Sequence, residues 1–151
     1  EILLNYDKDT DSGFVKIDFF PNVKASAGHG LLAQDEEPLP IKFRSVFVRQ
    51  TLNSSPSDLF AMKVKGDSMF PTIKDGDLLI VDKSKVKAQS ERPYVVVQDE
   101  QVSVKYIRML SVDKLMLISE NKSFGDQEID LSDGDHFRIL GEVRHIQRTL
   151  N

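Results

Sequence analysis

Short apolar segments, separated by residues that favour turns, follow one another from residue 59 to residue 143. Segments of this length are typical of β-strands, and turn sequences such as Asp75-Gly76-Asp77 lie between them. The spacing therefore predicts a mostly-β fold of twisted antiparallel sheets with very little helix. The expected strands are Leu59–Val64, Leu78–Val81, Tyr94–Val97, Val102–Ile107, Leu115–Ser119 and Phe137–Val143.

The upstream part of the chain is less regular. Residues 1–13 are polar and acidic and are expected to form a linker or tail. Phe14–Phe20 has the pattern of a strand, which Pro21 should end. Ile41–Arg49 mixes apolar and basic residues and fits either a strand or a short helix.

Composition limits the classes of function that fit. The chain has no cysteine, so disulfides and thiolate metal sites are excluded, and neither a metal nor a cofactor is expected. Its net charge of −4 argues against a DNA-binding surface, which is normally basic. No apolar run approaches the ~20 residues of a membrane span, and no signal peptide is recognisable. We expect a cytoplasmic protein that does not bind membranes, and a fragment of a longer chain because no methionine precedes Glu1.

Ser68 is the first candidate for chemistry. Gly66 permits the backbone angles of a tight turn, and Pro71 ends any strand, so Ser68 should be presented at a corner. Backbone N–H groups around Gly66, Asp67 and Met69 could then point at a developing oxyanion. Spacing alone leaves another possibility open, in which Ser68 only caps a turn.

Lys105 is the second candidate, because it interrupts an apolar strand. A free lysine titrates near ~10.4, so only roughly one in two thousand is neutral at pH 7. Burial would lower the pKa of Lys105 towards the range of a general base. The alternative is an ordinary strand lysine whose stem packs while its ammonium reaches water.

The two residues together carry a family resemblance. The run Val64–Asp77 resembles the nucleophile signature of the LexA-like self-cleaving repressors, which include LexA, phage CI-type repressors and UmuD. In that family the serine follows Gly-Asp and precedes Met, and a lysine lies on a later strand. Here 105 − 68 = 37 residues separate Ser68 from Lys105, in the matching context Val102–Ile107. The resemblance implies a LexA/signal-peptidase-like fold with a serine–lysine dyad.

The resemblance also implies a substrate within the same chain. Val23–Gly30 is similar to the family's scissile region, so cleavage is expected between Ala27 and Gly28. Residues 14–40 would then hold a strand and the cleavage site, and residues 41–151 the catalytic and dimerisation core. The implied protein is the C-terminal regulatory domain of a repressor of the SOS or phage type, whose self-cleavage relieves repression.

By the same resemblance, the expected partners are a second copy of the chain and an activated RecA filament or an antirepressor. DNA would be bound only by a domain that precedes Glu1. Two alternatives stay open, a dimerisation and partner-binding domain that does not cleave itself, and an UmuD-like polymerase accessory protein.

Overall fold

The computed structural model describes residues 13–22, 38–134 and 136–150, and these residues form one nine-stranded sheet. The predicted mostly-β fold is confirmed. The strand order is β2-β1-β3-β4-β9-β5-β6-β7-β8. The strands comprise β1 (Phe14–Phe20), β2 (Leu39–Arg44), β3 (Leu59–Lys63), β4 (Leu78–Asp82), β5 (Tyr94–Gln98), β6 (Gln101–Met109), β7 (Lys114–Ile118), β8 (Gln127–Asp130) and β9 (Phe137–Gln147).

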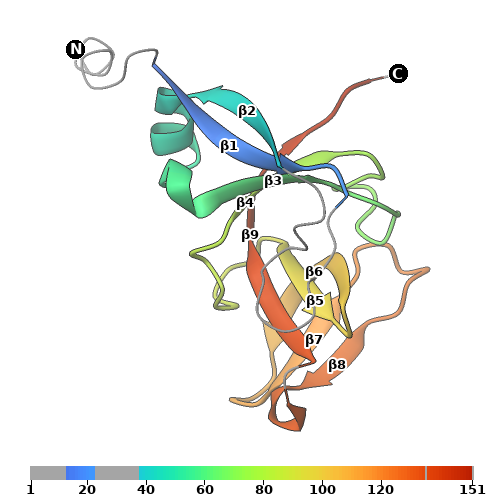
Figure 1. Ribbon diagram of the computed structural model, residues 1–151. Helices are drawn as coiled ribbons and strands as arrows, with labels where there is room; N and C mark the ends of the chain where they lie inside the picture. The colour runs from blue at the N-terminus through green and yellow to red at the C-terminus, as the bar shows by residue number, and fades with distance from the viewer. Residues whose placement is uncertain (1–12, 23–37, 135, 151) are drawn as a thin grey trace.

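The long strand β9 joins two halves of the sheet, as Figure 1 shows. Its first half, from Phe137 to Glu142, pairs with β5, and its second half, from Glu142 to Gln147, pairs with β4. Both pairings shift register where β9 changes partner, and such irregularities bend and twist a strand. The polypeptide therefore folds into two β-rich lobes that share one strand.

Every neighbouring pair of strands is antiparallel except β1 and β3, which run parallel. In that pair Phe20, the last residue of β1, lies opposite Met62 near the end of β3. β2 pairs along the other side of β1, so β1 and β2 form the end of the sheet.

Three clusters of buried apolar side chains stabilise the sheet. The largest lies between the two lobes and includes Met62, Met69, Val104 and Val143. A second cluster packs β1 and β3 against Val48, and a third packs β5 against β7. Because side chains alternate along β6, Val104 enters the first cluster while Ile107 enters the third.

Helical structure among the described residues is confined to short segments: Ser45 and Val46 followed by η1 (Phe47–Thr51), then η2 (Pro56–Asp58) and η3 (Leu131–Asp133). The segment expected as a strand or a short helix, Ile41–Arg49, contributes to both, because β2 ends at Arg44 and η1 begins at Phe47. No helix within the described ranges is long and apolar enough to cross a membrane.

Candidate active site

The loop between β3 and β4 carries Ser68. Gly66 opens it with a φ of +88°, a left-handed conformation that glycine adopts without steric cost, and Gly76 near its end has a φ of +86°. The Gly66 N–H donates to the Asp75 carboxylate at 2.7 Å, and the Gly76 N–H donates to the Val64 carbonyl at 2.8 Å. These bonds close the loop across its base, as the sequence predicted for a tight turn at Gly66.

An ion pair with the end of the chain fixes the far side of this loop. Asp77 is 1% exposed, and both of its carboxylate oxygens accept from the Arg148 guanidinium, one of them at 2.7 Å. The same carboxylate accepts from the Lys74 N–H at 2.8 Å. The Arg148 hydrogen bonds lower the pKa of Asp77 more than burial raises it, so the carboxylate is held in its charged form.

Ser68 itself is half-buried on this loop. Its backbone carbonyl accepts from the Asn121 N–H at 3.0 Å, and the Asn121 side chain donates to the carbonyl of Asp67 at 3.0 Å. Within the described residues, no hydrogen bond uses the Ser68 hydroxyl. The backbone conformation around Ser68 is therefore fixed while its hydroxyl is left available.

Two of the three residues predicted to flank the oxyanion are exposed, and one is buried. Gly66 and Asp67 lie on the surface of the loop, whereas the Met69 side chain is 2% exposed in the largest core cluster. No acceptor in the described part of the chain takes the Met69 N–H. Met69 thus anchors the loop by its side chain and leaves one backbone donor beside Ser68.

Lys105 lies on β6 and is half-buried, on the face of the strand that also carries Ile107. Its amine donates to the Ser119 hydroxyl at 2.8 Å and lies 5.9 Å from the centre of the Phe124 ring. Burial lowers the pKa of Lys105 from the ordinary 10.5, and the charge of Asp126 opposes part of that shift. The sequence prediction of a lysine with a lowered pKa is consistent with this environment.

Ser68 and Lys105 are connected through one short segment that follows β7. Asn121 in this segment binds the backbone of Ser68, and Ser119, two residues earlier, binds the amine of Lys105. Among the hydrogen bonds of the described residues, none joins the Ser68 hydroxyl directly to the Lys105 amine. The structure therefore ties the predicted pair to a common support without a direct bond.

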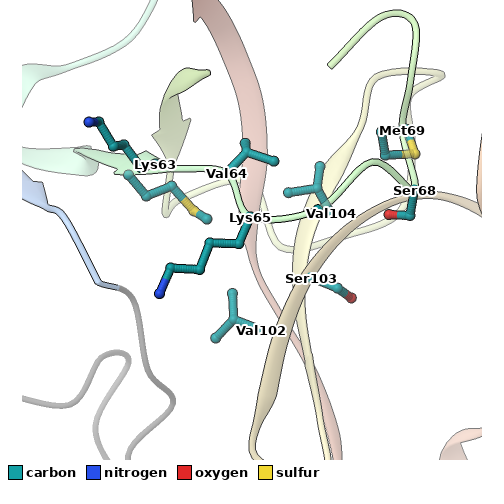
Figure 2. A pocket seen from close by; sticks show the side chains of 10 residues that line it. Lys63, Val64, Lys65, Ser68, Met69, Val102, Ser103 and Val104 are labelled. Atoms are coloured by element: carbon teal, nitrogen blue, oxygen red, sulfur yellow. The ribbon is translucent and has the colours of Figure 1, made fainter. Parts of the chain in front are cut away.

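A small cleft of about 100 Å³ opens beside Ser68. Figure 2 shows that one wall is the chain from Lys63 to Met69 and that the other is β6 at Val102, Ser103 and Val104. The cleft suits small side chains.

Both walls of the cleft offer strand edges. β1 pairs with β3 only as far as Met62, and β7 pairs with β6 only from Tyr106 onward. Residues 102–104 pair with β5 and residue 63 pairs with β4, so in the described part of the chain each wall has a strand ladder on one side only. Such edges accept an extended peptide by backbone hydrogen bonding.

Three supporting residues were not identified from the sequence: Ser119, Glu120 and Asn121. Glu120 accepts from both the N–H and the hydroxyl of Thr72, which adds a further bond to the loop that carries Ser68. The available signal was a polar run, Ser-Glu-Asn-Lys-Ser, directly after an apolar strand. The predicted scissile residues, Ala27 and Gly28, lie outside the described residues.

Comparison with known proteins agrees with this arrangement. Residues 19–144 match the family model described as Peptidase S24-like. The chain is 30% identical over 142 residues to a protein of Haemophilus influenzae described as an uncharacterized HTH-type transcriptional regulator, covering 93% of this chain and 59% of that protein. It is 29% identical to the 26 kDa repressor protein of Escherichia phage HK022, covering 81% of this chain and 53% of the repressor.

A third relative is the LexA repressor of Desulfitobacterium hafniense, which is 35% identical over 105 residues, covering 66% of this chain and 46% of the repressor. The chain thus spans about half the length of the curated relatives it matches. The family match extends from β1 into β9 and includes Ser68, Lys105 and both walls of the cleft. The chain therefore belongs to the Peptidase S24-like family, among relatives named as LexA and phage repressors.

Proposed function

We propose that this chain is the self-cleaving regulatory domain of a transcriptional repressor. Ser68 is the nucleophile, Lys105 is the general base, and the bond between Ala27 and Gly28 is the substrate. Family membership and the repressor relatives support the class of protein. The lowered pKa of half-buried Lys105 supports its role, since a base must lose its proton near the working pH.

The parallel register of β1 against β3 carries the proposal. Phe20, the last residue of β1, lies opposite Met62 near the end of β3, and the two strands run parallel. Ser68 follows Met62 by 68 − 62 = 6 residues, and Ala27 follows Phe20 by 27 − 20 = 7 residues. The loop that carries Ser68 and the segment that contains Ala27 therefore follow neighbouring strand ends, at similar distances along the sequence.

The cleft fits the proposed substrate. The sides of its two walls that carry no ladder could hold an extended segment, and its small volume favours the small side chains of residues 25–28. Seven extended residues reach about 23–25 Å, so the segment after Phe20 is long enough to enter the cleft.

The reaction would proceed through an ester. Neutral Lys105 takes the hydroxyl proton of Ser68 as the oxygen attacks the Ala27 carbonyl carbon, and the Met69 N–H stabilises the oxyanion. Collapse breaks the bond to Gly28, whose nitrogen receives the proton from Lys105. Water, deprotonated by Lys105, then hydrolyses the ester between Ser68 and Ala27 and leaves a carboxylate.

In this proposal residues 14–40 carry the strand and the cleavage site, and residues 41–151 form the catalytic and dimerisation core. DNA binding belongs to a preceding region that residues 1–13 link to the core, because longer relatives, of which the match covers 59% and 53%, are named as an HTH-type regulator and a repressor. Cleavage would separate the two parts and abolish bivalent binding to an operator. An activated RecA filament or an antirepressor would promote the cleavable state.

A second candidate function is a dimerisation domain that does not cleave itself. One observation favours it, because the Lys105 amine donates to Ser119 and shares no hydrogen bond with Ser68 among the described residues. Apo active sites often hold their catalytic groups at longer distances than the reacting complex does, so this geometry also agrees with cleavage.

Time courses of the purified protein at about pH 10, where a far larger fraction of Lys105 is neutral than at pH 7, would test the proposal. We expect first-order cleavage at a rate that does not depend on protein concentration. Ser68→Ala and Lys105→Ala should abolish it. Ser111→Ala and Lys114→Ala remove an exposed serine and lysine that show the Ser-x-x-Lys spacing, and they should cleave like the wild type. Cleavage that persists without Ser68 would refute the proposal.

A further inference from the structure

Ser119 is placed against Lys105 by the pairing of two strands. The β6–β7 ladder ends where Tyr106 lies opposite Ile118. The next residues outward are Lys105 on one strand and Ser119 on the other, and their side chains meet at 2.8 Å. The register of the sheet, rather than a flexible loop, therefore determines which residue lies beside the amine.

The position of Ser119 is closely determined. Ser119 is buried, with only 1% of its surface exposed. Its backbone N–H donates to the Asp126 carboxylate at 3.1 Å, and its carbonyl accepts from the Lys122 ammonium at 2.8 Å. A buried hydroxyl with both backbone groups bonded has little freedom to move.

We propose that Ser119 is a positioning residue, which holds the Lys105 amine in the orientation that removes the proton of Ser68. The inference depends on the proposed function and extends it to a residue outside the dyad. A neutral amine has two N–H groups and one lone pair. When Ser119 accepts one N–H, rotation about the last bond of the side chain is restricted, so the lone pair can be kept towards the nucleophile.

The chemical identity of the partner matters as much as its position. A carboxylate at this place would stabilise the ammonium form and keep Lys105 protonated at neutral pH. A hydroxyl holds the nitrogen without a full negative charge, so the amine can still become neutral. Two other groups near the amine, the Phe124 ring and the Asp126 carboxylate, favour its charged form weakly. The Asp126 carboxylate is itself paired with the Lys122 ammonium at 3.4 Å.

The neighbouring backbone gives the inference a second support. Asn121 lies two residues after Ser119 and binds the carbonyls of Asp67 and Ser68. A shift of this segment would move the amine of Lys105 and the loop of Ser68 together. Ser119 therefore acts from a segment that contacts both members of the pair.

The test compares Ser119→Ala and Ser119→Thr with Ser123→Ala, a matched control on the same segment whose hydroxyl is exposed. Cleavage rates are measured from neutral pH to the alkaline plateau. Because a displacement of about 1 Å can cost ~100-fold in rate, we expect Ser119→Ala to lower the plateau at least ~10-fold. Ser119→Thr, which keeps the hydroxyl, should restore most of the rate, and Ser123→Ala should match the wild type.

The pH profile separates positioning from general damage. Loss of the Ser119 oxygen removes an acceptor from the ammonium form, so the pKa of Lys105 should fall and the rate profile should shift to lower pH. A lower plateau together with a midpoint at lower pH is the expected signature. A lower plateau with an unchanged midpoint would overturn the inference.

A readout without catalysis keeps this inference distinct from the proposed function. In Ser68→Ala protein, the Lys105 side chain can be titrated by NMR through its Cε resonance, with and without Ser119→Ala. A fall in the Lys105 pKa when the hydroxyl is lost supports the Ser119 contact. This holds even if the wild-type protein does not cleave itself, a result that would refute only the proposed function. An unchanged pKa overturns the Ser119 inference. If Ser119→Ala does not fold, Ser119→Cys keeps a side chain of similar size with a much weaker acceptor and serves instead.

Discussion

Replacement of Asp126 by asparagine should accelerate self-cleavage at neutral pH. Burial lowers the pKa of Lys105, and the charge of Asp126 raises it. Asparagine removes that charge but keeps a side-chain oxygen that can accept from the Ser119 N–H, as Asp126 does at 3.1 Å. The Lys105 pKa should therefore fall further, and more of the amine should be neutral below that pKa.

The size of the effect follows from the exposure of the carboxylate. The Asp126 side chain is 39% exposed, so water screens its charge. Exposed ion pairs contribute about 0.2–1 kcal/mol. With 1.36 kcal/mol for each factor of ten, the rate at pH 7 should rise about 1.5- to 5-fold. At the alkaline plateau Lys105 is neutral in both proteins, and their rates should be equal.

The assay is a set of first-order cleavage rates for wild type and Asp126→Asn across the pH range. The two curves should be displaced along the pH axis and converge at high pH. Raising the salt concentration should narrow the gap at neutral pH, because screening weakens exposed charges. A ratio of rates that is constant at every pH, or a slower variant at pH 7, would refute the assignment of Lys105 as the base.

Three further predictions concern the framework of the site. Gly141→Ala would place a Cβ 2.4 Å from the Asp82 carbonyl oxygen, a clash that only backbone movement can relieve. Chemical denaturation should therefore show that the free energy of unfolding falls by about 3 kcal/mol, the upper end for overpacked cores. Asp77 has a lowered pKa in the folded protein, so it stabilises the fold above the ordinary carboxyl pKa of 3.8, and this stabilisation is lost as the pH falls through the folded-state pKa. Arg148→Met should make this loss of stability on acidification smaller, as measured by thermal melts at decreasing pH. Asn121→Ala removes the side-chain bond to Asp67, so cleavage should slow while circular dichroism spectra stay unchanged; an unaltered rate would count against the role of this segment.

The sequence was sufficient to predict most strands because their local signals are strong. The expected strands Tyr94–Val97 and Val102–Ile107 are present and form a hairpin, in which Asp99 and Glu100 have positive φ angles of 48° and 67° that suit a tight turn. Gly66 has a φ of +88°, the kind of angle expected from the sequence for a glycine in a tight turn. Each of these features depends on a few adjacent residues.

Features that depend on contacts between distant segments were not predictable in this way. β9 extends to Gln147, four residues beyond the expected end at Val143, because it must pair with both β5 and β4. Ser119 was assigned to a strand without a role, since its contact with Lys105 follows from a register that the sequence alone does not reveal. The pairing of Asp77 with Arg148 likewise joins residues 71 positions apart.

Intact mass spectrometry of the wild-type protein after incubation at about pH 10 tests the central claim most directly, because a far larger fraction of Lys105 is deprotonated there than at neutral pH. We predict two products, residues 1–27 and residues 28–151, which appear together at equal molar amounts. A chain that stays intact under these conditions, or one cut at a different bond, would contradict the assignment of Ser68 and Lys105 to the hydrolysis of the bond between Ala27 and Gly28.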